Sequence, residues 1–128
     1  MDFRKGVVPG IAAGIVIVVL GFVSSMLMPA NTEWYMQTFP QMSMSSMIFS
    51  QLLIGLIMGI VYTVISPSIP GEGMSKGVNY GIIVFLFAGV MWPVMASSFA
   101  PLSIWLGDLI ASLILYAIAG ATVAKVHG

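Results

Sequence analysis

The chain has no cysteine, one histidine and very few charges, with four Lys or Arg and four Asp or Glu among its 128 residues. Without cysteine it can form no disulfide, thiolate metal site or cysteine nucleophile. So few basic residues form no patch that binds nucleic acid. Because 59% of the residues are hydrophobic, the chain has too little polar surface to cover a soluble globule. These scarcities predict an integral membrane protein.

Catalytic groups are equally scarce. The one histidine, His127, lies near the C-terminal end, where a frayed tail is expected. No Ser-His-Asp set, pair of acids or phosphate-binding glycine loop followed by lysine can be assembled from the remaining residues. We therefore expect a protein that is not an enzyme and that needs no cofactor, with copper as the one metal to consider.

Four apolar runs fill most of the chain, over residues 7–28, 47–66, 77–97 and 102–124. A helix needs about 20 residues to cross the hydrocarbon core of a bilayer. We therefore predict an all-α integral membrane protein, with residues 1–128 forming a single domain of four transmembrane helices. The bilayer itself is the first partner that this composition implies.

Residues 29–46 form the one long predicted loop. Its aromatic residues Trp34, Tyr35 and Phe39 are of the kind that settles at the level of the lipid headgroups. Asn31 or Thr32 would cap a short helix there. We interpret the loop as a flap on the membrane surface, and a disordered tether is the alternative because the loop also contains many polar residues.

The basic residues all fall on one side of a four-span protein. Arg4 and Lys5 precede the first span, Lys76 lies between the second and third, and Lys125 follows the fourth. By the positive-inside rule, both termini are cytoplasmic and the loop 29–46 faces outward. We expect a multi-pass protein of the cell (plasma) membrane.

Two short sequences indicate an internal duplication. "KGVVPGI" (5–11) and "KGVNYGI" (76–82) match at five of seven positions, and each opens a predicted helical hairpin. Aligning the second helices, 46–57 with 103–114, sets Gln51 opposite Asp108. The hairpins would form a parallel repeat, and chance matching within a small apolar alphabet is the alternative.

Asp108 is the one charge inside the fourth apolar run. It lies about 9 Å beyond the start of that run at 1.5 Å per residue. An acid near the bilayer centre costs about 2.5 to 3.5 kcal/mol on insertion scales and almost always faces a bundle interior or a water cavity. Its depth and helix face predict a polar site with these neighbours: Gln51, Ser112, Ser24, Ser25 and Trp92.

This site supports two functional hypotheses. The leading one is permeation of a proton, cation or small solute, with Asp108 as the protonatable group and Gln51 and Ser112 as its hydrogen-bonding partners. The alternative is a non-catalytic accessory subunit of a larger membrane complex, in which Asp108 binds another helix. The pair Trp92–Pro93 removes a backbone hydrogen bond and predicts a kink, so that Pro93 would act as a hinge in the third span.

Small residues recur along the predicted helices. The glycines are Gly10, Gly14, Gly21, Gly55, Gly59, Gly81 and Gly120. Such stripes allow helix backbones to approach closely in lipid. They predict a tight bundle, a homo-oligomer, or both.

Methionines gather at the predicted outer ends of the helices, among them Met42, Met44, Met47, Met91 and Met95. Thioethers select Cu(I), so copper handling at the outer surface is a second alternative function. "MWPVM" (91–95) resembles the methionine pair of the Ctr-type copper transporters, over these five residues only. The simpler interpretation is that methionine serves as a flexible apolar filler.

Overall fold

The computed structural model describes residues 4–41 and 43–127, and this part of the chain is mostly helical and contains no strand. The elements are α1 (Arg4–Leu27), α2 (Pro29–Thr38), α3 (Met44–Ile65), the 3-10 turn η1 (Ser66–Ser68), α4 (Gly73–Val84), the π-helical segment η2 (Phe85–Gly89), α5 (Met91–Ala96) and α6 (Leu102–His127). Four helical stretches are long and apolar enough to cross a membrane: Arg4–Leu27, Met44–Ser68, Gly73–Ala96 and Leu102–His127. The predicted all-α, four-span architecture is therefore confirmed.

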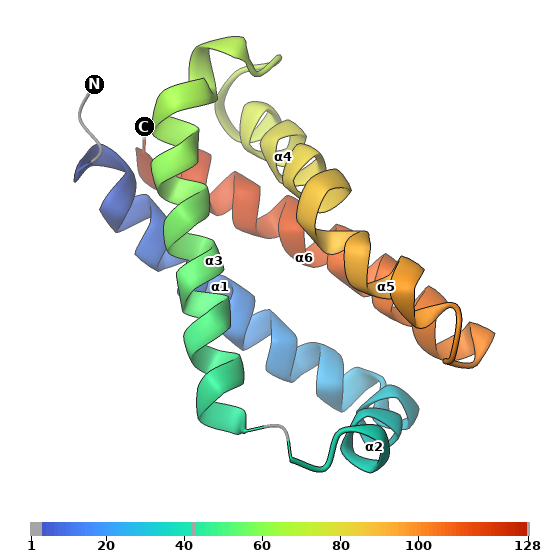
Figure 1. Ribbon diagram of the computed structural model, residues 1–128. Coiled ribbons are helices and arrows are strands. Elements are labelled where there is room, and N and C mark those ends of the chain that lie inside the picture. Colours follow the sequence, from blue (N-terminus) through green and yellow to red (C-terminus); the bar gives the residue numbers. More distant parts are fainter. Residues whose placement is uncertain (1–3, 42, 128) are drawn as a thin grey trace.

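The spans form two antiparallel hairpins (Figure 1). α1 packs on α3, α4 packs on α6, and the contact between α1 and α6 joins the two hairpins. The termini and the connection from α3 to α4 lie at one end of the bundle, here called the terminal end. α2 and the connection from α5 to α6 lie at the other end, here called the loop end.

Glycines bring the backbones of each hairpin together. A Cβ added to Gly59 would lie 2.2 Å from the carbonyl oxygen of Gly6 and 2.4 Å from the Cα of Gly10. In the second hairpin, a Cβ added to Gly120 would lie 2.3 Å from the carbonyl oxygen of Gly77 and 2.6 Å from the Cα of Gly81. A side chain at either position would collide with backbone, which cannot move aside as a flexible side chain can.

The other predicted packing glycines lie along the same pair of hairpins. Gly55 faces Gly14, since a Cβ on Gly55 would be 2.2 Å from the Cα of Gly14. Gly21 differs, because the nearest atom to a Cβ there is the amide nitrogen of Gln51, 3.0 Å away. The glycine contacts therefore give way to a side-chain contact as α1 approaches the loop end.

Aromatic residues fill the core towards the terminal end. The Tyr80 hydroxyl donates to the Met58 carbonyl oxygen at 2.5 Å, and the Tyr62 ring meets the Tyr80 ring with centroids 5.1 Å apart. The His127 ring packs edge-on against Tyr62 at 5.1 Å, and α6 continues to His127. The expectation of a frayed tail at His127 was wrong, because Tyr62 gives this ring a packing partner.

The third span is broken earlier than the sequence predicts. Its α-helix begins at Gly73 and gives way to η2, where the Val90 amide donates to the Phe85 carbonyl at 2.9 Å. Pro93 is the third residue of α5, and the first amides of a helix have no intrahelical acceptor. The irregularity therefore lies in the segment before α5, and Pro93 itself fits the first turn of a new helix.

The segment 29–46 contains the helix α2. A short helix was expected in the flap interpretation of this segment and not in the alternative of a disordered tether. Pro29 occupies its first turn, and neither Asn31 nor Thr32 is the N-cap, which is Met28. The predicted cap position was wrong because the Asn31 side chain turns towards α6 instead. Ser43 caps α3, its hydroxyl accepting from the Ser46 amide at 3.3 Å.

Candidate functional site

Asp108 is bonded to α2 through both carboxyl oxygens. Its Oδ1 accepts a hydrogen bond from Asn31 Nδ2 at 3.1 Å, and its Oδ2 accepts from the Tyr35 hydroxyl. Asn31 Nδ2 also donates to the Ile104 carbonyl oxygen at 3.1 Å, and Asn31 is only 8% exposed. These bonds fasten a short helix outside the spans to an acid inside the fourth span.

Helix geometry explains why these groups meet. Asn31 and Tyr35 are four residues apart and so project from the same face of α2, as Ile104 and Asp108 do on α6. Gly107 leaves room between them, because a Cβ there would lie 3.2 Å from Asn31 Nδ2. A larger residue at this position would press on the buried amide.

Trp92 of α5 extends the network. Its Nε1 donates to the Tyr35 hydroxyl oxygen at 2.5 Å, and that hydroxyl in turn donates to Asp108. A chain of two hydrogen bonds thus leads from Trp92 Nε1 to the Tyr35 hydroxyl and from that hydroxyl to Asp108 Oδ2. Asn31 Nδ2 donates to the other carboxyl oxygen, Oδ1. An ionised carboxylate accepts at both oxygens, whereas a protonated one turns one oxygen into a donor.

Aromatic rings surround the Tyr35 hydroxyl. Trp34, Tyr35, Phe39, Trp92 and Phe99 form an aromatic cluster whose contacting rings have centroids 5.1 to 6.4 Å apart. Burial, followed by the hydrogen bond to Asp108, raises the pKa of the Tyr35 phenol above its ordinary value. The phenol therefore keeps its proton at neutral pH and remains a donor to Asp108.

Gln51 lies elsewhere. It sits on α3 beside Gly21 of α1, and α3 packs mainly on α1. The bonds that the structure gives Asp108 run instead to Asn31 and Tyr35. Asp108 therefore has Asn31 and Tyr35 as partners in place of the predicted Gln51. Two residues at the same depth meet only if their helices pack side by side, and α3 packs mainly on α1.

Among the remaining predicted neighbours of Asp108, Trp92 joins it through Tyr35, whereas Ser24 and Ser25 belong to α1. Ser112 lies one turn further along α6 and is half-buried. The Ser25 hydroxyl donates to the Gly21 carbonyl at 3.0 Å within its own helix, and Ser24 is half-buried beside it. Pro93 is buried directly after Trp92 in α5.

The candidate copper ligands are exposed and come from two separate elements. Met44 and Met47 lie at the start of α3, and Met91 and Met95 lie on α5. Figure 1 shows these two elements well apart. Met42 lies outside the described residues, and within those residues no group of three or more His, Cys, Asp or Glu gathers to hold a metal.

The sequence analysis did not predict two partners of Asp108, Asn31 and Tyr35, because both lie in the segment interpreted as a surface flap. Their spacing of four residues was the available signal.

Fold and site together define the class: a multi-pass, all-helical membrane protein with one polar site at an end of its bundle. A scan against protein-family models, a search of curated proteins and a search of solved structures found no match to this chain.

Proposed function

We propose that this protein moves a proton or a small cation across the cell membrane, with Asp108 as the group that binds it. The observation that carries the proposal is the pair of bonds from Asp108 to α2. An acid placed in a membrane span is expensive and is functional by default. Here the acid holds a short helix outside the spans, so its charge state acts directly on a separate element.

α2 serves as a lid in this proposal. When a proton or cation occupies one Asp108 oxygen, that oxygen becomes a weaker acceptor for the donor bonded to it. The group bonded to that oxygen, the Tyr35 hydroxyl at Oδ2 or the Asn31 amide at Oδ1, is then less well satisfied, and a buried donor left without an acceptor costs about 1 to 3 kcal/mol. The lid loosens, and Asp108 becomes open to the loop side.

The distribution of charge favours a cation. Glu33 and Asp108 lie at the loop end, whereas all four basic residues, Arg4, Lys5, Lys76 and Lys125, lie at the terminal end. A surface with acids and no basic residue raises the local concentration of cations. By the same distribution we place both termini in the cytoplasm and the loop end outside.

η2 and α5 supply a second movable part. Trp92 bonds the Tyr35 hydroxyl, so α5 is linked to the lid. The π-helical turn at Phe85–Gly89 separates α5 from α4, and π-helical turns are frequent at functional sites. We assign the hinge to η2, and Pro93, the residue predicted as the hinge, lies just after it in the first turn of α5.

We also propose that the two hairpins are duplicates in a revised register. Gly59 approaches Gly6 and Gly10 in the way that Gly120 approaches Gly77 and Gly81. Matching Gly59 with Gly120 moves the alignment of the second helices by one helical turn. Gln51 then corresponds to Ser112, and no counterpart of Asp108 is expected at Gln51.

The competing function, an accessory subunit of a larger complex, has less support. It requires Asp108 or the glycine faces to be open to another chain. Both Asp108 oxygens accept bonds within the chain, and Gly10, Gly14, Gly55 and Gly59 face one another inside the first hairpin. Any homo-oligomer would accordingly use the large apolar side chains on the outside of the bundle.

The test is ion flux in proteoliposomes under an imposed potential, measured for protons with a trapped pH dye and for monovalent cations by tracer uptake. Asp108→Asn should reduce the flux to the leak of empty liposomes. Glu72→Gln is the matched control, because Glu72 is an exposed acid at the terminal end, and this variant should retain wild-type flux. Equal flux in Asp108→Asn and the wild type, or no flux of either kind in the wild type, would overturn the proposal.

A further inference from the structure

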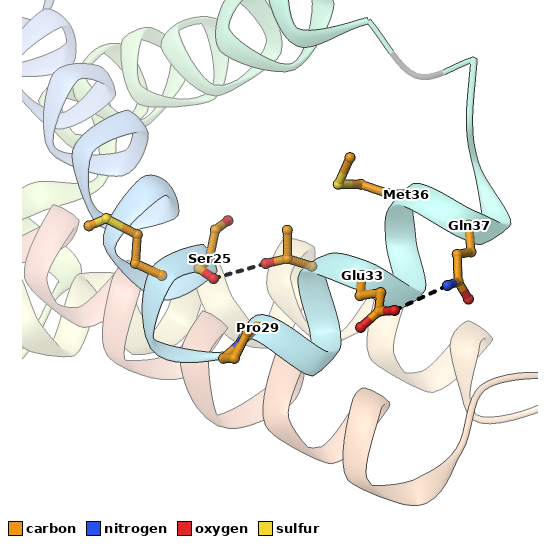
Figure 2. A pocket seen from close by; sticks show the side chains of 7 residues that line it. Ser25, Pro29, Glu33, Met36 and Gln37 are labelled. Atoms are coloured by element: carbon orange, nitrogen blue, oxygen red, sulfur yellow. Dashed lines mark hydrogen bonds between the residues drawn. The ribbon is translucent and has the colours of Figure 1, made fainter.

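A groove lies beside α2 at the end of α1, and Figure 2 shows the side chains that line it. The end of α1 and the outer side of α2 form it, and its volume is about 530 Å³. It is lined by Ser25, Met26, Pro29, Thr32, Glu33, Met36 and Gln37. Because α1 is a candidate span that ends at Leu27, the groove opens at the boundary of the apolar segment.

The two hydroxyl groups of the groove have used their hydrogens within the protein. The Ser25 hydroxyl donates to the Gly21 carbonyl at 3.0 Å, and the Thr32 hydroxyl donates to the Ser25 carbonyl at 2.9 Å. A hydroxyl has one hydrogen, so both oxygens keep only lone pairs for a ligand. Gln37 Nε2 donates to Glu33 Oε1 at 3.3 Å, as Figure 2 shows. The groove therefore offers mainly acceptors.

Its charge is negative. Glu33 contributes a carboxylate on the exposed side of α2, and no Lys or Arg lies at this end of the molecule. An anionic group entering the groove would find no cation to pair with and would be repelled by Glu33. A cationic group with N–H donors is complementary both to the charge and to the acceptors.

The rest of the lining is apolar and adaptable. Met26 is 75% exposed and Met36 is 69% exposed, and methionine side chains are flexible and polarisable enough to fit irregular apolar ligands. Pro29 of α2 also lines the groove and adds a rigid apolar face. This part of the groove suits an alkyl chain that continues from the membrane.

We propose that the groove binds an amphiphilic amine, a single alkyl chain with an ammonium head. The ammonium group donates to the Glu33 carboxylate, and the chain lies against Met26 and Met36. The volume of about 530 Å³ is in the range of sites for one small ligand. A two-chain phospholipid is a poorer fit because its phosphate has no basic partner here. The site stands independently of any ion carried by Asp108.

The test uses dodecylammonium as the probe, titrated calorimetrically into the full chain in phosphatidylcholine nanodiscs, with empty nanodiscs subtracted. The amine should bind saturably, and dodecanol, which has the same chain without the charge, should bind about tenfold more weakly because the charge-assisted bonds are lost. Glu33→Gln should weaken amine binding by a similar factor of about ten. Glu72→Gln, a matched loss of an acid at the terminal end, should leave it unchanged.

A second variant tests the groove rather than the charge. Met36→Trp fills the space that the alkyl chain would occupy while leaving Glu33 in place, and it should abolish saturable binding of the amine. Equal binding of the amine and the alcohol, unchanged binding in Glu33→Gln, or binding that survives Met36→Trp would each overturn the proposal. Because Met36 is exposed, this variant keeps the fold, which circular dichroism verifies.

Discussion

The two ends of the bundle are held together by different kinds of contact. Towards the terminal end, glycine backbones touch directly, as at Gly59 against Gly10 and Gly120 against Gly81. At the loop end, hydrogen bonds and aromatic rings attach α2 to α5 and α6. Backbone contacts of the first kind cannot adjust, whereas side-chain bonds to a titratable acid can be broken without unfolding a span. The structure thus combines a half held by backbone contacts with a half held by side-chain contacts.

The largest expected effect comes from adding one methyl group towards the terminal end. Gly59→Ala places a Cβ 2.2 Å from the Gly6 carbonyl oxygen, so the hairpin must separate. We expect a loss of about 3 kcal/mol in the free energy of unfolding, the upper end for overpacking. Unfolding in mixed micelles by SDS titration measures it.

The control is Gly21→Ala, where the new Cβ meets only the movable Gln51 amide. This variant should change the stability by less than about 0.5 kcal/mol. Equal losses in the two variants would contradict the difference that we draw between backbone and side-chain contacts.

The next effect is local to the loop end. Asp108→Ala removes both acceptors and leaves the Asn31 amide and the Tyr35 hydroxyl with fewer partners, which costs about 2 kcal/mol. We expect the loss to appear as faster amide hydrogen exchange in α2, with α1 and α3 unchanged. Uniformly faster exchange in all four spans would show instead that Asp108 supports the whole bundle.

Substitutions at two tyrosines, one at each end of the bundle, allow a direct comparison of the two ends. Tyr35→Phe and Tyr80→Phe each remove one hydroxyl that donates, to the Asp108 carboxyl group and to the Met58 carbonyl respectively. Each should cost about 1 kcal/mol at neutral pH. Only the cost of Tyr35→Phe should shrink as the pH falls, because a protonated acid is a weaker acceptor than a carboxylate. Urea unfolding at a series of pH values measures both, and parallel pH profiles would contradict the distinction.

The smallest effect is expected at Pro93. Proline inside a helix costs about 3 kcal/mol, but at the first turn it replaces an amide that needs no acceptor. Pro93→Ala should therefore change stability by less than about 0.5 kcal/mol. A much larger change in thermal unfolding would mean that Pro93, rather than η2, sets the break in the third span.

The sequence predicts the spans well because their signal is local. Each apolar run has the length of a membrane crossing, and the structure forms a long apolar helical stretch over each of them. Asp108 stands out in the same way, as one charge in an apolar helix. Its neighbour Trp92 was predicted from depth alone and does join the network, through Tyr35.

The rest of the site depends on tertiary packing. Gln51 has the right depth, but its helix packs mainly on α1 and not on α6. Asn31 and Tyr35 reach Asp108 because α2 folds back over α6, where Gly107 leaves space for the Asn31 amide. No periodic pattern in the sequence predicts that α2 folds back over α6. The π-helical turn at Phe85–Gly89 likewise has no local signature that separates it from an ordinary helix.

Hydrogen exchange of α2 as a function of pH, corrected for the intrinsic rates, tests the central claim most directly. In the wild type, α2 should exchange slowly at neutral pH and faster in acid, while the glycine-packed hairpins stay protected throughout. Asp108→Asn, which resembles the protonated acid, should give fast exchange in α2 at every pH. Wild-type exchange in α2 that is independent of pH, or a pH response that persists in Asp108→Asn, would contradict the account of Asp108 as a protonatable latch.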